Sequence, residues 1–466
     1  MKCGAKWSYD FYQPLDRIEK IYINQVIPKE NSFYIAWYGG RDEWTVCYRV
    51  KDSDDSWNKQ IVYVSNTEIT DLTKYVEYEF YVECAGVKSM SGYARTGFVP
   101  GTVVNYLHPT DTKYAFAGQY LCTPSLLKHP DGYLLASMDL FDRATPQNLT
   151  LIFRSDDDGE SWYHYTELFP CFWGTLFLHN SEVYMLATST EYGDLLIGKS
   201  TDGGKTWGEP TVLARGACNK EVSGWHKSSM PVIEHEGRLW CAVDYGCHRQ
   251  GRHMNCLASV KADSDILDSS NWTITDPLDY NPEWYGAVKG DNRGFIEGNA
   301  VVTPDGKIGN ILRYATDLGE PQYGLAGFLM GDCSDPEKSL EFHKFIPFPG
   351  NLSKFDIKRD PESGLYFSIM SRITGKGWVK ERTVLGLAYS EDLENWHLLC
   401  DLVNYEDADY KKVGFQYVSF AFDGNDIIYL SRTAFNGARS FHDNNYVTFD
   451  RVCNFRAMVP LKIREI

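Results

Sequence analysis

Polar side chains of the kinds that bind or activate small molecules gather in three short segments of the sequence. Two of these segments are GWHKSS, which places His226 and Lys227 beside Trp225, and GNLSKF, which contains Asn351 and Lys354. Strands and turns do not require so many polar groups. Imidazole, amide and ammonium groups that converge on one place are typical of a binding or catalytic site.

The third segment, FNGARSFHDNNYVTF, is the richest, with Arg439, His442, Asp443, Asn444 and Asn445. A ring of His, Asn, Arg and carboxylate groups suits a ligand with many hydroxyls, such as a sugar. A polar loop that makes Asn and Asp turns explains the same residues without any ligand. Both interpretations stay open at this point.

The charge balance excludes several classes of partner. The chain has 466 residues and a net charge of −17, with no dense run of Lys and Arg. We therefore expect no nucleic-acid partner, since phosphate binding needs basic patches. No stretch approaches the ~18 apolar residues of a membrane helix, so we expect no membrane partner. The oligomeric state stays open.

The first twenty residues, MKCGAKWSYDFYQPLDRIEK, lack the apolar core of a secretory leader. We expect a cytoplasmic protein, or a secreted one if a native leader was trimmed. Twelve scattered cysteines without a CxxC pair then favour reduced, mostly buried thiols. His248 and His253 lie between Cys247 and Cys256, but this spacing matches no standard ligand set. The sequence therefore predicts no metal and no other cofactor.

Short runs of alternating, β-branched and aromatic residues, split by Gly, Asp, Asn and Pro, predict an all-β protein. Residues 1–100 contain strands at the spacing of a β-sandwich, among them SFYIAWYG and YEFYVECAG. Leu72, six residues before Tyr78, resembles the tyrosine corner of fibronectin type III domains, with Trp37 as the core aromatic. That resemblance implies a hydrogen bond between Tyr78 and the backbone just upstream. Pro100-Gly101 then begins a linker.

Residues 101–466 repeat a pattern of strand, tight polar turn and strand six times. The repeats are LLKHPDGYLLAS, TLFLHNSEVYMLA, PVIEHEGRLWCAV, VVTPDGKIGNILR, KRDPESGLYFSIM and SFAFDGNDIIYLS. Their spacing suits the four-stranded blades of a β-propeller. We expect six blades, although a divergent seventh would also fit the length.

One eight-residue turn occurs twice in this region, as SDDDGESW (155–162) and STDGGKTW (200–207). Its Asp can accept backbone N–H groups within the turn, and its Gly supplies a permissive backbone angle. The turn resembles the Asp-box, or BNR repeat, of bacterial sialidase-like propellers, and SEDLENW is a degraded third copy. The resemblance gives Asp157 and Asp202 a structural role.

The sialidase resemblance also implies catalytic residues. Those enzymes use three arginines around a carboxylate, an Asp as acid/base, and a Tyr nucleophile activated by a Glu. The segment FIEGNAVVTPDGKIGNILR fits the pattern with Glu297 and Arg313, and FQYVSFAFDGNDIIYLSR places Tyr417 at the start of the last hairpin.

Other positions depart from the family. YLCTPSL has Leu121 and Cys122 where the first arginine would stand. Arg382 and Arg432 are options for the third arginine. A narrower resemblance, to enzymes acting on rhamnosyl-glucuronic acid ends, implies a catalytic His in a Ser-His-Asp motif, but this chain has Met138 between Ser137 and Asp139.

We therefore expect an exo-acting carbohydrate-active enzyme of sialidase-like fold, a glycoside hydrolase that removes one terminal sugar, acidic or neutral, from an oligosaccharide. A lyase on uronic-acid ends and a non-catalytic glycan-binding propeller stay open as alternatives. The expected catalytic residues are Glu297, Asp139, Tyr417 and His226. The expected substrate-binding residues are Arg313, Lys227, Lys354, Arg432, His442 and Asn445.

Overall fold

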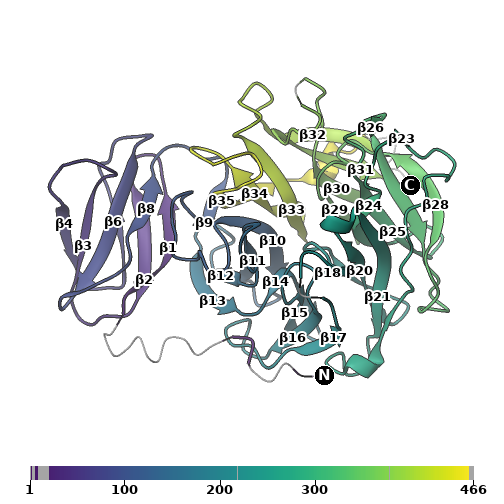
Figure 1. Cartoon of the computed structure of the whole chain (residues 1–466), viewed down its shortest axis with the longest axis horizontal. Helices are drawn as coiled ribbons and strands as arrows, with labels where there is room; N and C mark the ends of the chain where they lie inside the picture. The colour runs from purple at the N-terminus through teal and green to yellow at the C-terminus, as the bar shows by residue number, and fades with distance from the viewer. Residues whose placement is uncertain (1, 3–5, 9–19, 218, 377, 461–466) are drawn as a thin grey trace.

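The computed structural model describes residues 2, 6–8, 20–217, 219–376 and 378–460 (Figure 1). These residues contain no α-helix, only strands and three 3₁₀ turns, η2 (His248–Gln250), η3 (Ser269–Asn271) and η4 (Phe455–Met458). The prediction of an all-β protein is therefore confirmed. Within the described residues, no helix has the length and apolar character needed to cross a membrane.

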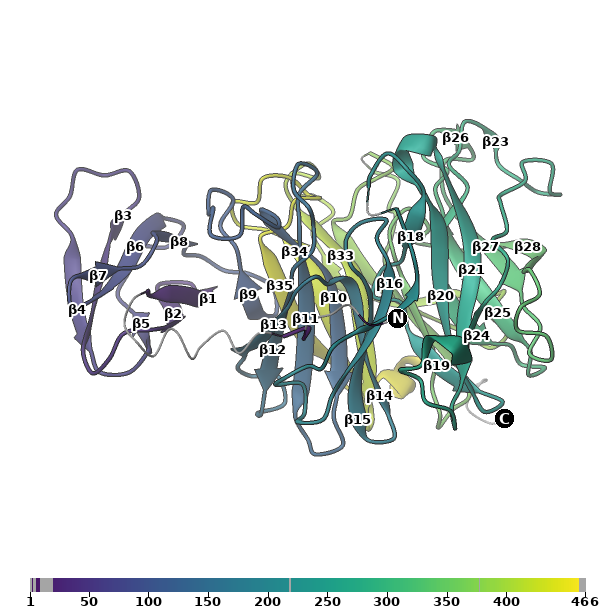
Figure 2. The ribbon, with the colours of Figure 1, turned by 60° about the horizontal axis from the view of Figure 1, so that its bottom comes forward.

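Two sheets near the N-terminus form a sandwich beside the larger part of the molecule (Figure 2). One sheet contains β1 (Tyr22–Pro28), β2 (Phe33–Tyr38) and β5 (Asn66–Ile69). The other contains β4 (Asn58–Val62), β3 (Trp44–Val50), β6 (Glu77–Cys84), β7 (Val87–Lys88) and β8 (Gly92–Arg95).

The core of the sandwich follows from the alternation of its strands. Strand β6 buries every second side chain, and Trp37 is 1% exposed between the sheets. The Tyr78 hydroxyl accepts a hydrogen bond from the Thr73 amide at 3.0 Å, which confirms the predicted bond to the upstream backbone. The relationship to fibronectin type III domains stays a prediction.

Six further antiparallel sheets of the described residues follow one another along the chain. The first two contain β10 (Tyr120–Lys128), β11 (Leu134–Phe141), β12 (Thr150–Ser155) and β13 (Tyr163–Leu168), then β14 (Phe172–His179), β15 (Glu182–Thr188), β16 (Leu195–Ser200) and β17 (Thr211–Ala214). The third contains β18 (Gly224–His226), β19 (Val232–His235), β20 (Arg238–Cys247), β21 (Arg252–Lys261) and β22 (Trp272–Ile274).

The last three sheets keep the same antiparallel order. The fourth contains β24 (Phe295–Val302), β25 (Ile308–Tyr314), β27 (Leu325–Met330) and β28 (Glu341–Pro347), beside a small pair of β23 (Lys289–Gly290) and β26 (Gly319–Glu320). The fifth contains β29 (Asp356–Arg359), β30 (Tyr366–Ser371), β31 (Val384–Ser390) and β32 (His397–Asn404). The sixth contains β33 (Gly414–Asp423), β34 (Asp426–Ala434), β35 (Tyr446–Val452) and β9 (Thr102–Tyr106).

The six sheets close into a ring (Figure 1). Strand β9, which comes before the first sheet in sequence, pairs with β35 and completes the sixth sheet, with Tyr106 opposite Tyr446. Strands β10 and β33 also pack together, which joins the sixth sheet to the first. The pairing of β9 with β35 thus ties the beginning of the ring to its end, and each sheet keeps only short edges.

A side chain of each sheet is hydrogen-bonded to the backbone of the next at 2.9–3.0 Å, all the way round. The side chains are Ser125, Thr175, Asp244, Asn299, Asp356 and Ser419, in the order of the sheets. All six are buried. Polar residues in the middle of apolar strands thus satisfy backbone groups that sheet pairing leaves open.

The repeated turns join the third strand of a sheet to the fourth. Asp157 Oδ1 accepts a hydrogen bond from the Ser161 amide at 2.9 Å, and the Ser155 hydroxyl accepts one from the Gly159 amide. The second copy repeats both bonds with Asp202, Thr206, Ser200 and Gly204. In the shorter third copy, the Leu393 amide takes the place of the glycine amide and donates to Ser390.

The described residues near the N-terminus do not belong to the sandwich, so the predicted boundary at 1–100 needs a correction. Trp7 is fully buried in a core that includes Leu135 and Met185 of the first two sheets of the ring. Its ring meets Trp207 edge-on at 6.1 Å, and its amide donates to Gly208. The cause is the apolar pocket beside the second turn, which a large aromatic side chain fills.

The turn tryptophans are predicted to stabilise the ring. We expect Trp207→Ala to lower the free energy of unfolding by about 3–5 kcal/mol, because it leaves a cavity against Trp7. Tyr285→Ala is the matched control, since Tyr285 is 98% exposed and should change stability by less than ~0.5 kcal/mol. Denaturant unfolding followed by fluorescence measures both; equal effects of the two variants would contradict a structural role for the turn.

Candidate functional site

The first strand of four sheets carries a β-bulge with a left-handed residue at its centre. The bulge residues are Thr123, Trp173, Glu297 and Tyr417, with φ between 45° and 57°. In each case the pairing register with the second strand shifts around that residue. A non-glycine residue in this region is strained, and such strain gathers at functional sites. The bulge also re-aims the side chain that it carries.

The remaining two sheets interrupt their first strand at the corresponding place, and a buried lysine marks each break. Lys227 lies between β18 and β19, and its ammonium donates to the carbonyl of Trp173 at 2.9 Å. Lys354 lies just before β29, and its ammonium donates to the carbonyl of Val418. Both lysines hold the backbone of a bulge. The structure therefore places these two predicted binding residues beneath the site, as supports.

Two of the bulge residues meet around Arg313. Nη1 of Arg313 donates to Oε2 of Glu297 at 2.7 Å and to the Tyr417 hydroxyl at 3.1 Å. The Tyr417 hydroxyl lies near enough to the Glu297 carboxylate to help lower the pKa of Glu297. Three of the residues predicted from sequence thus form one compact cluster, although Glu297 and Tyr417 come from different sheets.

The charges of this cluster follow from burial and from Arg313. Burial is the largest single influence and would raise the pKa of Glu297, but Arg313, His226 and Tyr417 together outweigh it and lower that pKa. Burial and then Glu297 raise the pKa of Tyr417, while the arginines oppose them. At neutral pH, the cluster thus pairs an ionised carboxylate with a protonated phenol.

Two more arginines surround Tyr417. The Arg432 guanidinium lies 4.9 Å from the centre of the Tyr417 ring, and that of Arg382 lies at 5.8 Å. Both options for the third arginine therefore reach the site. Arg432 occupies the same place in its sheet as Arg313, since each stands opposite the residue that precedes a bulge.

Arg382 is 6% exposed, and its Nε and Nη1 have no hydrogen-bond partner among the described residues. Burial lowers the pKa of Arg382 to about 9. A buried guanidinium with open donors is costly unless an acceptor completes it. Arg432 is better satisfied, because it donates to Asn444 and to the His442 carbonyl.

Asp244 was missed by the sequence analysis and braces the site from the third sheet. Its Oδ2 accepts from the Glu297 amide at 2.9 Å and lies 3.1 Å from Nδ1 of His226. His226 is 2% exposed, and its ring lies 4.1 Å from the Trp173 ring. A signal for Asp244 exists in the sequence, because it is the one charged residue in the otherwise uncharged run LWCAVDYGC.

Asp139 repeats the role of Asp244 two sheets earlier in the ring. It stands opposite Cys122 on the second strand, and its Oδ2 accepts from the amide of the bulge residue Trp173 at 2.9 Å. Its Oδ1 accepts from Thr150 at 2.5 Å. Both oxygens are thus engaged within the first two sheets, and among the described residues no hydrogen bond or ion pair joins Asp139 to Glu297 or Tyr417.

The C-terminal polar segment lies beside the site and mainly fixes its own loop. Asn445 exchanges hydrogen bonds with the backbone of Phe435: its Oδ1 accepts from the Phe435 amide and its Nδ2 donates to the Phe435 carbonyl. His442 pairs with Asp443 at 3.1 Å, and its ring lies 5.8 Å from that of Tyr120. Burial and then Arg432 lower the pKa of His442 to about 4.

The position of Asp139 leads to a pH prediction. Burial raises the pKa of Asp139 to about 7, so the folded chain binds a proton that the unfolded chain releases near pH 4. This proton stabilises the fold at low pH, and its contribution is lost as the pH rises from about 4 to 7. We expect Asp139→Asn to flatten the pH dependence of unfolding in that window, measured by chemical denaturation. An unchanged pH dependence would contradict the raised pKa.

Comparisons with known proteins agree with this architecture. No protein-family profile and no curated protein matches the chain. Among solved structures, a Hadza microbial sialidase is similar with a TM-score of 0.54 at 12% identity, over 96% of this chain and 98% of that one. An α-L-arabinofuranosidase from Fusarium graminearum, solved with an iminosugar inhibitor, has a TM-score of 0.50 at 12% identity, over 76% of this chain and 98% of the other.

The match to the sialidase spans nearly the whole chain, so it extends over the sandwich as well as the ring of six sheets. At these identities the likeness concerns the fold, and it confirms the resemblance that the repeated turns and the Glu297 segment indicated. The chain therefore has the fold of the sialidase-like β-propellers.

Proposed function

We propose that the protein is an exo-acting glycoside hydrolase that removes a terminal acidic sugar from an oligosaccharide. The observation that carries this proposal is the contact of Arg313 with both Glu297 and Tyr417. A phenol beside an ionised carboxylate is an activated nucleophile, because the carboxylate can take the phenol proton as a new bond forms.

The proposed reaction has two steps. In the first, the Tyr417 oxygen attacks the anomeric carbon while its proton passes to Glu297, and the bond from that carbon to the leaving oxygen breaks. The leaving oxygen receives a proton from a general acid. In the second step, water attacks the anomeric carbon and gives a proton to the conjugate base of that acid, the bond to Tyr417 breaks, and Glu297 returns its proton to the phenol oxygen.

The acidic character of the sugar is inferred from the arginines. Arg313, Arg382 and Arg432 converge on one tyrosine, and the open donors of Arg382 match the paired oxygens of a carboxylate. Burial strengthens such a contact, since the donors are already removed from water. This observation also favours an acidic end over the neutral arabinose end.

The first test is Glu297→Gln, which keeps the size of the side chain and removes its negative charge. We expect turnover to fall by at least ~100-fold, because the phenol loses its proton acceptor. Glu341→Gln is the matched control on the outer strand of the same sheet, where the side chain is 70% exposed, and it should behave as wild type. Turnover within a few-fold of wild type in Glu297→Gln would rule out this role.

The products identify the reaction. Mass spectrometry of a panel of sialylated, uronic-acid-terminated, rhamnosylated and neutral oligosaccharides should show two fragments that together gain one water, with an acidic sugar released. Fragments that sum to the intact substrate, one of them unsaturated, would instead identify a lyase. Binding without any product would make the protein a glycan-binding propeller.

Arg382 offers a test of the acidic sugar. We expect Arg382→Met to raise the Kd for acid-terminated oligosaccharides at least ~10-fold and to leave binding of neutral ones unchanged. Its free energy of unfolding should stay level or rise by about 1–4 kcal/mol, because an uncompensated buried charge is removed.

Arg372→Met serves as the control for this experiment, since Arg372 is paired with Asp401 through two 2.7 Å bonds on the side of the fifth sheet. It should leave oligosaccharide binding unchanged. Calorimetric titration with the same acidic and neutral ligands measures both variants. Equal loss of acidic and neutral ligands in Arg382→Met would speak against a carboxylate site.

A further inference from the structure

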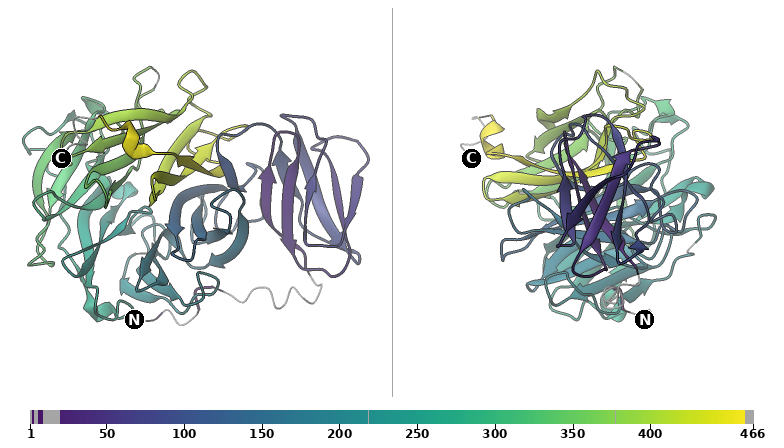
Figure 3. Two further views of the ribbon diagram at one scale, coloured as in Figure 1. Left: turned by 180° about the vertical axis from the view of Figure 1, so that it is seen from behind. Right: turned by 90° about the vertical axis from the view of Figure 1, so that its left-hand side faces the viewer.

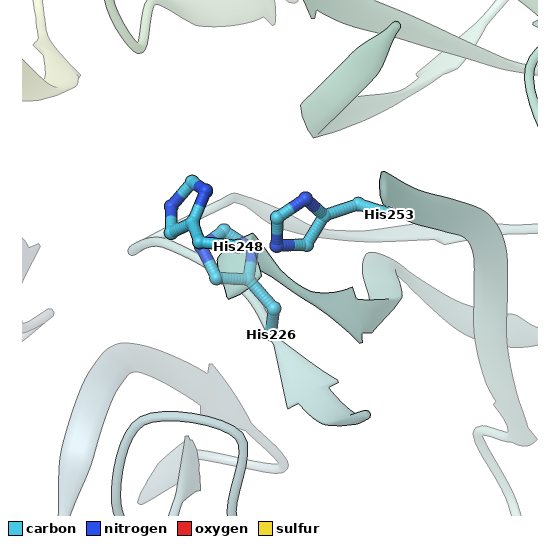
Figure 4. A group of neighbouring side chains, drawn as sticks. All are labelled: His226, His248 and His253. Carbon is cyan, nitrogen blue, oxygen red and sulfur yellow. The ribbon is translucent and has the colours of Figure 1, made fainter. Parts of the chain in front are cut away.

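Three histidines from separate segments converge beside the candidate site (Figure 4). His226 ends β18, His248 begins η2, and His253 lies in β21. One nitrogen of each ring lies within 4.8 Å of the others, and the ring centres are 4.7–6.2 Å apart. Figure 4 shows the three rings gathered around one point. His226 and His253 are buried, whereas His248 is exposed.

A hydrogen bond fixes which nitrogen of the His226 ring stays free, and a second hydrogen bond allows a free nitrogen on the His253 ring. Nδ1 of His226 faces the Asp244 carboxylate, which only accepts hydrogen bonds, so Nδ1 carries the proton and Nε2 keeps its lone pair. Nε2 of His253 lies 3.3 Å from the Tyr192 oxygen, which also accepts from the His248 amide at 3.1 Å. If that oxygen accepts from His253 too, Nδ1 of His253 keeps its lone pair.

This arrangement has the features of a protein metal site. Metal-binding histidines commonly donate their second N–H to a carboxylate or another oxygen, which sets the orientation of the ring. Asp244 provides such a carboxylate, and Asn255 in turn donates to its other oxygen at 2.8 Å. Nitrogens around a tetrahedral zinc ion, each at ~2.0–2.1 Å, lie roughly 3.4 Å apart. Binding of the ion would shorten the present spacing, which is at most 4.8 Å, by rotation of side chains such as the exposed His248.

We propose that His226, His248 and His253 bind one divalent transition-metal ion of the zinc class. Three imidazoles select such ions over Ca²⁺ and Mg²⁺, which prefer oxygen ligands. Three protein ligands leave a fourth position for water or a sugar hydroxyl, and the exposure of His248 gives access to it. Asp244 contacts both His226 and the backbone amide of Glu297, so this residue links the proposed metal site to the candidate catalytic cluster. The proposal does not depend on the hydrolase activity.

His248 and His253 were considered in the sequence together with two nearby cysteines. Only the fold brings His226, the third histidine of the group, beside them. A second group, His235, Glu236 and Cys333, also brings three possible ligands together. Nε2 of His235 is already engaged with the Gly306 carbonyl at 2.7 Å, and Glu236 is exposed. That group serves as an internal control.

The test uses the full chain without a polyhistidine tag. After incubation with Zn²⁺ and desalting, elemental analysis should find one zinc per chain, and incubation with Ca²⁺ should leave no calcium. Co²⁺ in place of zinc should give the visible absorption of a four-coordinate ion. His248→Ala should weaken zinc binding more than ~100-fold, the upper range for loss of an outer partner, and Asp244→Asn should weaken it ~10–100-fold.

Cys333→Ser should retain the zinc with unchanged affinity. Because His248 is exposed, His248→Ala should keep the wild-type Tm in the presence of a chelator, which separates loss of the metal from loss of the fold. No zinc retained by the wild-type chain would overturn the proposal. Zinc retained equally by His248→Ala, or lost in Cys333→Ser, would overturn it as well.

Discussion

The candidate site depends on a strained backbone position in the innermost strands. A regular strand would direct Glu297 and Tyr417 along the face of its sheet, as its neighbours are directed. The left-handed bulge adds one residue and turns the side chain, so that two residues from different sheets reach the same arginine. Such a bulge survives only where its surroundings hold it. Asp244 and Lys354 do this by bonding the amide of Glu297 and the carbonyl after Tyr417.

The electrostatics of the site oppose those of the whole chain. The protein carries a net charge of −17, while three arginines face Glu297 and Tyr417 at the centre of the ring. Long-range attraction therefore does not concentrate an anion at this surface, and salt screens it within ~10 Å in any case. Selection of an acidic ligand has to come from short, desolvated contacts. Arg382, with two donors open, is the clearest source of such contacts among the described residues.

The sequence predicted the features that repeat or that lie close together along the chain. The turns at 155–162 and 200–207, the Tyr78 bond and the Glu297–Arg313 pair each depend on a short segment, whose spacing is visible in one dimension. Residues that meet only through ring closure were harder to assign. Arg382 and Arg432 remained alternatives because no local pattern distinguishes an arginine of the site from one on the surface. In the structure, both approach Tyr417.

The polar segments were correctly found as unusual, but their roles differ from those expected. Lys227 and Asn445 bond backbone groups around the site. A buried ammonium that satisfies carbonyls and a ligand-binding ammonium have the same sequence signature, since both are lysines in apolar surroundings. The position of Trp7 shows the same limit, because its partner, Trp207, is distant in sequence. Only the packing of the second sheet reveals the pocket that Trp7 fills.

The closing of the ring by β9 constrains how the chain can fold (Figure 3). This strand follows the sandwich and is made before the other strands of the ring, whereas its partner β35 is made after them. Until then its backbone groups have no partner, and the sixth sheet is incomplete. Contacts between segments so far apart in sequence form slowly, because the intervening loop must be closed first. The propeller is therefore completed only after all the other strands of the ring have been made, and until then the nascent chain presents an open strand edge.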